Sequence, residues 1–300
     1  MSQGISRFFY IKLVAVGRKT NLRRFRAIDN LNTYIRRKLR PEYIITKRHN
    51  FKVYLDELDS LHLSVNKDWE PFQTNLMERI VKEGDTVLDI GANIGFDTLM
   101  LSKLVGEKGR VYAFEPDPIT FELAKKNLEA NNIKNVELIN KAVSHEKGEV
   151  TFYRSDSNTS ANSMSSSVGS NSITVDAISL DEYFGKDFKV DFIKIDVEGA
   201  EGLALKGMEN IIKNSNDLIF ITEYSPLTLT DIGKGINLSA KGYLELLEKL
   251  DFKFFDILER KSILLPVSIH DITKKYTEGF TNLLCIKKKN SSELRDILNL

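Results

Sequence analysis

Two stretches of this sequence carry the residue types that a nucleoside-binding site needs. In the first, an apolar run containing Asp89 leads into a turn with Gly91 and Gly95, and a helix-forming run follows. Backbone N–H groups at the start of such a helix can hold an anionic part of a ligand. In the second, Glu115 stands 24 positions after Gly91, at the end of another apolar run. A carboxylate there can accept both hydroxyls of a ribose, so the two stretches predict a nucleoside-binding βαβ unit.

Further carboxylates follow two other apolar runs. The run 190–195 leads directly to Asp196 and Glu198, and the run 219–222 ends at Glu223. Near-continuous apolar runs are typical of central parallel strands. In open α/β sheets, ligands lie beyond the carboxyl ends of the strands, near the position where the strand order reverses. If the 190–195 strand neighbours the first strand, Asp196 and Glu198 lie beside the glycine turn.

The glycine spacing separates two ligand classes. NAD sites usually show G-x-G-x-x-G, whereas this chain has D-x-G-x-x-x-G, beginning at Asp89. That pattern resembles motif I of class I S-adenosylmethionine (SAM) methyltransferases. Together with V-L-D-I-G-A-N-I-G and F-E-P, the run I-K-I-D-V-E-G-A-E at residues 193–201 resembles the FkbM-type methyltransferase family. The similarity covers roughly residues 70–287.

The resemblance implies both an activity and a cofactor site. Members of this family transfer methyl groups from SAM to hydroxyl oxygens, often on sugars or natural products. Asp196, Glu198 and Glu201 match the acidic motif that follows the strand. The cofactor contacts that the resemblance implies are Asp89, Gly91, Ala92, Asn93, Gly95, Phe96, Glu115, Pro116, Asn140, Ala142 and Asp196.

Methyl transfer to an alcohol needs a proton acceptor, because the hydroxyl proton leaves as the new bond forms. Asp196 is the first candidate, and Glu198 and Glu223 are the other catalytic candidates. Asp196 and Glu223 could instead hold a divalent metal such as Mg²⁺, which would lower the pKa of the hydroxyl. A purely structural role also stays open, in which Asp196 caps the following helix while Glu198 and Glu201 stabilise its first turn.

The elements that must position these residues alternate regularly along the chain. The hydrophobic pattern predicts strands at 86–91, 110–115, 135–140, 190–196, 218–223, 252–257 and 281–287, and helices at 70–82, 95–105, 118–131, 199–213 and 239–249. Such alternation is typical of a parallel sheet with helices on both faces. We therefore predict a doubly wound, Rossmann-like, seven-stranded α/β sheet. The family resemblance adds that the last strand is antiparallel.

Two segments interrupt this alternation. Residues 51–55 and 61–65 suggest a short β-hairpin before the first helix. Strand-like runs at 149–153 and 173–175 flank an insert, 155–172, in which half of the residues are serine. The insert has too few apolar residues for a core of its own, so it is either a surface loop or a lid over the substrate.

Charge is distributed unevenly along the chain. Residues 1–50 carry about +11 and the other 250 residues about −10. We interpret 1–50 as a basic helical extension of a methyltransferase domain at 51–300. The extension could contact an anionic membrane face or an acidic partner, or cover the edge of the domain. It has no nucleic-acid motif, so we expect no specific nucleic acid.

We expect the protein to be cytoplasmic, with a peripheral membrane contact as an option. The apolar run 8–16 is too short to span a bilayer. The lone Cys285 permits no intrachain disulfide, so no oxidising compartment is indicated.

Taken with these patterns, the family resemblance implies a SAM-dependent O-methyltransferase that acts on a hydroxyl of a sugar, a glycan or glycolipid, or another small natural product. Two alternatives remain open. A NAD-binding oxidoreductase would also use Glu115, but the third glycine of its pattern is missing. A non-catalytic SAM-binding module would not need the carboxylates that follow the strand.

Overall fold

The computed structural model describes residues 34, 35, 37–155, 161–165 and 171–287. The chain divides into two compact units, Met1–Trp69 and Glu70–Leu300. Within the described residues, no helix combines the length and the apolarity that crossing a bilayer requires. Most of the predicted basic extension and much of the serine-rich insert lie outside the described residues. The membrane contact of the extension therefore stays a prediction.

The first unit contains β1 (Tyr43–Ile45), β2 (Lys52–Tyr54) and the short helix α3 (Leu63–Asn66). The predicted hairpin between 51–55 and 61–65 is wrong, because β2 pairs with β1. Residues 61–65 lead into α3 instead. The reason is local: the carboxylate of Asp59 accepts hydrogen bonds from the backbone N–H and the hydroxyl of Ser64. Such side-chain bonds offer the backbone an alternative to strand pairing.

An eight-stranded sheet forms the centre of the second unit, in the order β12-β11-β13-β10-β9-β3-β4-β5. Its strands are β3 (Thr86–Ile90), β4 (Arg110–Phe114), β5 (Val136–Ile139), β9 (Phe192–Ile195), β10 (Ile219–Tyr224), β11 (Phe252–Leu258), β12 (Ile263–Val267) and β13 (Thr281–Lys287). The strands from β10 to β5 run parallel, and β13 is antiparallel to β10. The mostly parallel sheet and its antiparallel last strand are thus confirmed.

The prediction of seven strands is wrong by one, since it omitted β12. This strand pairs with β11 only, at the edge of the sheet, and contains Pro266. A proline cannot donate to a strand ladder and is tolerated at an edge. Its residues are mostly exposed, so the segment lacks the apolar run of a central strand.

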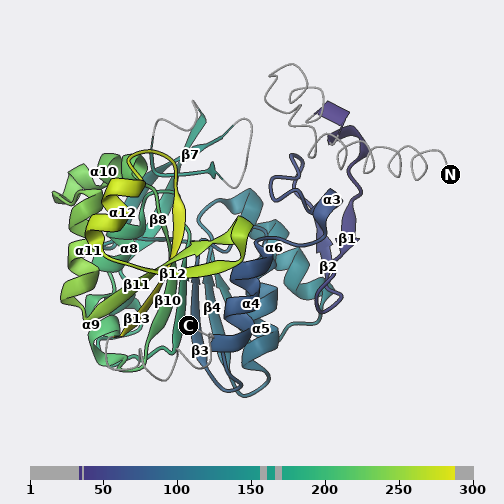
Figure 1. Ribbon diagram of the computed structural model, residues 1–300. Helices are drawn as coiled ribbons and strands as arrows, with labels where there is room; N and C mark the ends of the chain where they lie inside the picture. Colours follow the sequence, from purple (N-terminus) through teal and green to yellow (C-terminus); the bar gives the residue numbers. More distant parts are fainter. Residues whose placement is uncertain (1–33, 36, 156–160, 166–170, 288–300) are drawn as a thin grey trace. The chain divides into compact units, whose positions relative to one another are not determined.

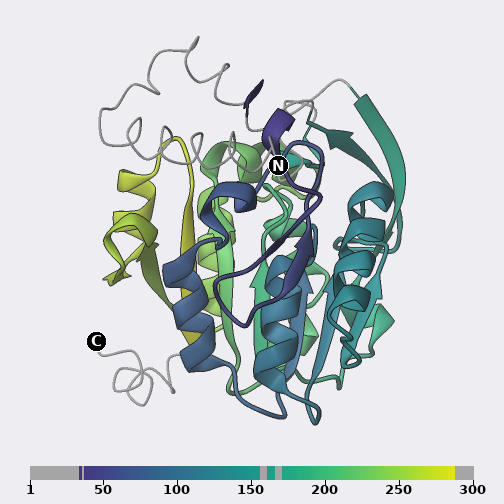
Figure 2. The ribbon, with the colours of Figure 1, turned by 90° about the vertical axis from the view of Figure 1, so that its right-hand side faces the viewer.

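Helices cover both faces of the sheet (Figure 1). They are α4 (Pro71–Ile80), α5 (Phe96–Val105), α6 (Pro118–Ala130), α7 (Leu180–Tyr183), α8 (Glu201–Lys206), α9 (Glu209–Asn214), α10 (Pro226–Gly233), α11 (Ala240–Lys249) and α12 (Ile269–Lys275), with short 3₁₀ turns at Lys234–Ile236 and Glu259–Lys261. One buried cluster joins Leu88 and Ile90 to α8, α9 and α11, and the other joins Val87 to α4 and α5. Figure 2 shows α4 and α5 packed over one face of the sheet.

The predicted helix 199–213 is divided into α8 and α9. The break lies at Gly207, where a Cβ atom would come within 1.9 Å of the carbonyl oxygen of Ser144. The carboxylate of Asp181 then accepts the backbone N–H groups of Asn210 and Ile211, which starts α9. Both features depend on segments distant in sequence, so the local pattern of apolar residues could not reveal the break.

A small second sheet stands apart from the main one, in the order β6-β8-β7. Its strands are β6 (Ala142–Val143), β7 (Gly148–Arg154) and β8 (Asn171–Ile178). The antiparallel pair of β7 and β8 contains the predicted strands 149–153 and 173–175, which are confirmed. The serine-rich insert connects these two strands.

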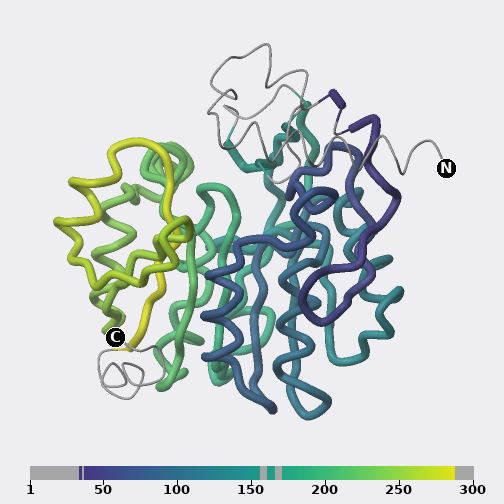
Figure 3. The backbone as a smooth tube through the Cα atoms, turned by 45° about the vertical axis from the view of Figure 1, so that its right-hand side comes forward, coloured from purple at the N-terminus to yellow at the C-terminus, as the bar shows by residue number. Residues whose placement is uncertain are grey.

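The order of strands in the main sheet reverses between β3 and β9. From β3 the chain proceeds through β4 to β5 in one direction, whereas β9 and β10 lie on the other side of β3. Figure 3 follows this course, with the blue segment on one side of the green centre and the yellow C-terminal segment on the other. The predicted adjacency of the 190–195 strand to the first strand is confirmed. This reversal is where open α/β sheets bind their ligands.

Candidate functional site

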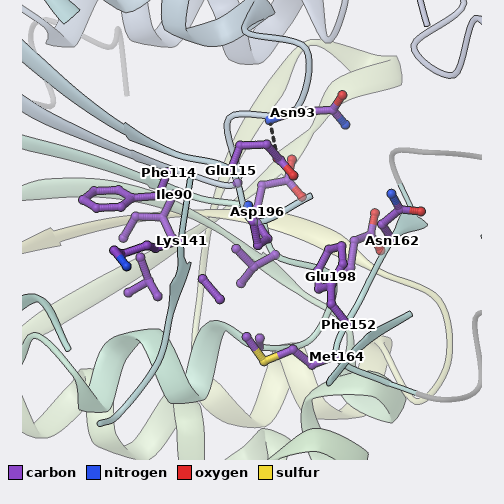
Figure 4. A pocket seen from close by; sticks show the side chains of 16 residues that line it. Ile90, Asn93, Phe114, Glu115, Lys141, Phe152, Asn162, Met164, Asp196 and Glu198 are labelled. Atoms are coloured by element: carbon purple, nitrogen blue, oxygen red, sulfur yellow. Dashed lines mark hydrogen bonds between the residues drawn. The ribbon is translucent and has the colours of Figure 1, made fainter. Parts of the chain in front are cut away.

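A pocket lies at the carboxyl ends of β3, β4 and β9, beside the reversal of strand order (Figure 4). It encloses about 530 Å³ of empty space, part of it open to solvent. Its lining combines an apolar wall with carboxylates at its rim. The lining residues are Ile90, Gly91, Asn93, Phe114, Glu115, Pro116, Lys141, Ala142, Val143, Phe152, Asn162, Met164, Asp196, Val197, Glu198 and Ala200.

Glu115 is the carboxylate that two neighbouring turns hold in place. Its side chain accepts the backbone N–H of Asn93 at 2.9 Å and that of Asp117 at 2.9 Å. Burial raises the pKa of Glu115 to about 8, although these two N–H donors lower it. A carboxylate oxygen that accepts one hydrogen bond retains a lone pair for another. Glu115 can therefore still accept ribose hydroxyls.

The glycine turn differs from its prediction in one respect. We expected free N–H groups there, but the N–H groups of Gly91 and Ala92 both donate to Phe114 O, and that of Asn93 donates to Glu115. The next N–H groups are also bonded, to Asn93 Oδ1 and Ala92 O. Gly91 instead permits close packing: with φ at +89°, its Cβ would lie 1.9 Å from the carbonyl oxygen of Asp196.

Three carboxylates gather where β9 and β10 end. One oxygen from each of Asp196, Glu198 and Glu223 lies within 4.8 Å of the other two. Burial, followed by the charges of Asp196 and Glu201, raises the pKa of Glu198 to about 8. Burial and the charges of Asp196 and Glu198 raise the pKa of Glu223 well above its ordinary value. The structure thus brings together the three catalytic candidates that the sequence analysis named.

The raised pKa of Glu198 predicts how stability depends on pH. Its carboxyl has an ordinary pKa of 4.5 and a folded value of about 8. The contribution of this carboxyl to the stability of the folded protein is therefore complete below about pH 4.5 and is lost as the pH rises through about 8. We expect Glu198→Gln to melt at a higher temperature than the wild type at pH 9, by roughly 2–4 °C per kcal/mol. At pH 5 the two proteins should melt together.

Asp271→Asn is the matched control for this measurement. Hydrogen bonds from Ser268 lower the pKa of Asp271, so its contribution to stability is lost as the pH falls. Asp271 stays ionised from pH 5 to pH 9, so the difference from the wild type should be constant over this range and should shrink only as the pH falls below about 3.8. A Glu198→Gln variant whose melting temperature tracks the wild type from pH 5 to pH 9 would contradict the prediction.

Some of the other predicted cofactor contacts line the pocket, and the rest are buried next to the residues that line it. Pro116 and Ala142 line it, whereas Ala92, Gly95 and Phe96 are buried behind the turn. Asp89 is also buried, and one of its oxygens accepts a hydrogen bond from the hydroxyl of Thr98 while the other has no hydrogen-bond partner among the described residues. The structure therefore separates the predicted residues into a lining group and a supporting group.

Asn140 has a different position from the one expected for an adenine contact. It is exposed, it does not line the pocket, and its amide donates to the carbonyl oxygens of Glu115 and Pro116. Asn140 thus fastens the turn that carries Glu115.

The sequence left open a purely structural role for the acids that follow β9. The structure supports that role for Glu201 but not for Asp196. One oxygen of Glu201 accepts the N–H groups of Val197 and Gly199, at 3.2 Å each. Helix α8 begins at Glu201 with Ala200 as its N-cap. Asp196 therefore lies outside the helix and does not cap it.

Sequence reasoning did not name several residues of this region, four of which bear on the site most directly. Phe152, Asn162 and Met164 reach the pocket from the small sheet and the serine-rich insert. No sequence signal placed the insert in space, so these three could not be found. Lys194 was detectable, because it precedes Asp196 by two residues and alternate residues of a strand share a face.

Comparisons with known proteins place the chain in a family. A family model described as the methyltransferase FkbM domain matches residues 89–254. The hexuronic acid methyltransferase AglP of Haloferax volcanii is 33% identical over 140 residues, which are 46% of this chain and 56% of AglP. An uncharacterised protein of Methanocaldococcus jannaschii is 36% identical over 80 residues, 26% of this chain and 30% of that protein. The chain thus spans about half or less of the length of these relatives.

Among solved structures, the methyltransferase FkbM of Methylobacillus flagellatus aligns with a TM-score of 0.42 and 15% identity. The alignment covers 76% of this chain and 53% of that chain.

Proposed function

Because this chain belongs to the FkbM methyltransferase family, we propose that it transfers the methyl group of SAM to a hydroxyl oxygen. The acceptor that we propose is a sugar, a glycan or glycolipid, or another small natural product. One observation carries the proposal: the carboxylates of Glu115, Asp196 and Glu198 line a single pocket. The name of AglP, a hexuronic acid methyltransferase, supports a sugar as acceptor.

The lining of the pocket fits a nucleoside. Glu115 is placed to accept ribose hydroxyls, and Ile90, Phe114, Phe152 and Met164 offer an apolar wall for a base. Bound SAM would supply an already activated methyl group, so the protein mainly contributes position. Alignment of reacting groups can contribute roughly 7–11 kcal/mol.

Asp196 is the group that we propose as proton acceptor. Its carboxylate lies on the rim of the pocket and is partly exposed, so an acceptor hydroxyl can reach it. The proton would pass from the acceptor hydroxyl to Asp196 while the oxygen takes the methyl group. A positioned base contributes typically about 10²–10⁴-fold to the rate.

A divalent cation is the second candidate for activating the hydroxyl. The observation in its favour is the mutual distance of 4.8 Å or less between oxygens of Asp196, Glu198 and Glu223. Three carboxylate oxygens suit Mg²⁺, which would lower the pKa of a bound hydroxyl. A chelator would then abolish turnover, whereas direct proton transfer to Asp196 would survive it.

The acceptor can be sought directly. Purified protein would be incubated with methyl-labelled SAM and a panel of methyl hexosides, free hexuronic acids and glycolipid extracts. The proposal expects label in an alkali-stable methyl ether of a panel member. Label confined to carboxylate esters would refute transfer to a hydroxyl.

The two alternatives from the sequence predict other outcomes. Family membership favours the methyltransferase over a NAD-binding oxidoreductase, which would instead bind a nicotinamide cofactor. A non-catalytic module would bind SAM without consuming it and without any dependence on Asp196.

The proposed role of Glu115 predicts a loss of SAM affinity in Glu115→Gln. The amide keeps the size of the side chain, but it offers one acceptor oxygen instead of two. A buried donor that is left without an acceptor costs about 1–3 kcal/mol, so we expect affinity to fall about 5–150-fold. Isothermal titration calorimetry with SAM measures this.

Glu122→Gln is the control, because Glu122 is an exposed residue of the neighbouring helix α6. Its affinity for SAM should equal that of the wild type. Equal affinities of Glu115→Gln and the wild type would exclude the ribose contact.

A further inference from the structure

Residues 161–165 of the serine-rich insert cross the carboxyl edge of the main sheet, and we call this segment the strap. At one end, Asn162 Nδ2 donates to Asp117 Oδ2 at 3.3 Å, on the turn after β4. At the other end, the hydroxyl of Ser165 donates to Asp231 Oδ2 at 3.0 Å, on helix α10 after β10. Strands β3 and β9 lie between β4 and β10 in the sheet. The strap therefore passes over the strand ends at which the pocket lies.

The strap presents alternate side chains to the pocket. Asn162 and Met164 are among the lining residues (Figure 4). Ser163, between them, is fully buried, and its hydroxyl donates to the carbonyl oxygen of Glu198 at 2.6 Å. Two backbone hydrogen bonds, of 2.7 and 3.0 Å, pair Ser163 with Tyr153 on β7. A ligand that fills the pocket must therefore contact the strap.

Asp117 is a buried residue that the cofactor turn and the strap share. Its backbone N–H donates to Glu115 Oε1 at 2.9 Å. Its side chain caps helix α6 by accepting the N–H of Ile119, and it also accepts the amide of Asn162. The proposed ribose contact and the strap are thus fastened to a single residue.

Arg154, the last residue of β7, is the cation that pairs with this carboxylate. Its Nε and Nη2 atoms lie 3.1 and 2.5 Å from Asp117 Oδ1. Hydrogen bonds between ionised groups are stronger than those between neutral ones. The next residue, Ser155, donates its backbone N–H to Asn162 Oδ1 at 2.9 Å. Arg154 therefore fixes both groups that hold the side chain of Asn162, although it does not line the pocket itself.

We propose that Arg154 is a positioning residue for the cofactor, which acts through Asp117 and Asn162 to hold the strap over the pocket. This inference rests on the proposed function, in which the pocket binds SAM. A strap that is ordered before binding does not have to be immobilised when the nucleoside enters. Such preorganisation increases affinity without any direct contact between Arg154 and the ligand.

Calorimetry with SAM tests the ion pair from both of its ends. We expect Arg154→Gln and Asp117→Asn each to lower the affinity about 2–30-fold, the range for residues that act without contacting the ligand. Asparagine is as good an N-cap as aspartate, so Asp117→Asn keeps the cap of α6. The double variant should bind about as weakly as the weaker single variant, because both substitutions break the same pair. Arg154→Lys keeps the charge and should restore part of the affinity.

A second background shows whether the effect passes through the strap. When Asn162→Ala and Met164→Ala are already present, Arg154→Gln should lower the affinity by less than about twofold. A role in folding alone would give the same factor in both backgrounds. Lys206→Gln, which breaks an ion pair with Glu209 of 2.9 Å, is the control and should keep the wild-type affinity.

Thermal unfolding shows which variants are folded. If Arg154→Gln fails to fold, Asp117→Asn gives the same comparison in both backgrounds. Wild-type affinity in the folded variants of Arg154 and Asp117, or an equal loss with and without the strap side chains, overturns the inference and leaves the proposed function standing. A wild type that binds no SAM refutes the proposed function, and the inference with it.

Discussion

Gly91→Ala is expected to abolish measurable SAM binding, a loss of at least about 100-fold or ~2.7 kcal/mol. The new Cβ would lie 1.9 Å from the carbonyl oxygen of Asp196 and 3.2 Å from a methyl group of Val197. The obstacle is backbone, so β3 and β9 must move apart at the pocket. Overpacking of this kind also costs about 1–3 kcal/mol of stability. Calorimetry with SAM and thermal unfolding measure the two effects.

Gly84→Ala is the matched control for that variant. Gly84 has φ at +94°, close to the +89° of Gly91, but a Cβ there would meet nothing within 4 Å. Both variants carry the strain of a left-handed backbone, and only Gly91→Ala adds a clash. Gly84→Ala should therefore lose some stability and keep its affinity for SAM. If the two variants bound SAM equally well, close packing of the turn against Asp196 would not matter to the site.

Asp196→Asn is expected to reduce methyl transfer by about 10²–10⁴-fold while the affinity for SAM changes less than about threefold. Asparagine keeps the size of the side chain but cannot take the proton of the acceptor hydroxyl. The ribose contact that we propose is Glu115, so we expect Asp196→Asn to affect methyl transfer more than the binding of SAM. Turnover with the acceptor from the panel and calorimetry with SAM separate the two quantities.

A control variant and a chelator show whether the loss of transfer is due to Asp196 itself and whether a cation takes part. Asp187→Asn changes an exposed aspartate on the loop before β9 and should transfer methyl groups at the wild-type rate. Wild-type turnover that survives EDTA supports direct proton transfer, and turnover lost in EDTA and restored by Mg²⁺ supports a cation at the three carboxylates. Wild-type turnover by Asp196→Asn would rule out both.

The main sheet was largely predictable because local pattern and global fold agree there. The apolar run that contains Asp89 and the runs that end at Glu115 and Asp196 predict buried strands, and the carboxyl ends of parallel strands share one edge of the sheet. The topology confirms that β3, β4 and β9 are neighbours. The errors arose where distant segments decide the outcome, as at Gly207, where the backbone of Ser144 interrupts a helix.

The sequence predicted the carboxylates of the candidate site but not the apolar residues that line its pocket. Asp196, Glu198 and Glu223 were named from strand ends, and their oxygens do converge. Phe152 comes from β7, and Met164 comes from the serine-rich insert, whose composition carries no information about where the insert lies in space. Asn140, expected at the adenine pocket, instead fastens the Glu115 turn, because its amide reaches two backbone carbonyls.

By itself, the sequence determined the family, the alternation of strands and helices around the glycine turn and the carboxylates at the strand ends, since residue types and spacing along single elements suffice for these. Only the tertiary structure decided that the N–H groups of the turn are already bonded, that Asn162 and Met164 of the insert line the pocket, and that Lys194 forms an ion pair with Asp196. Hydrogen bonds and charges act over a few ångströms in space, and that distance is set by how separate elements pack.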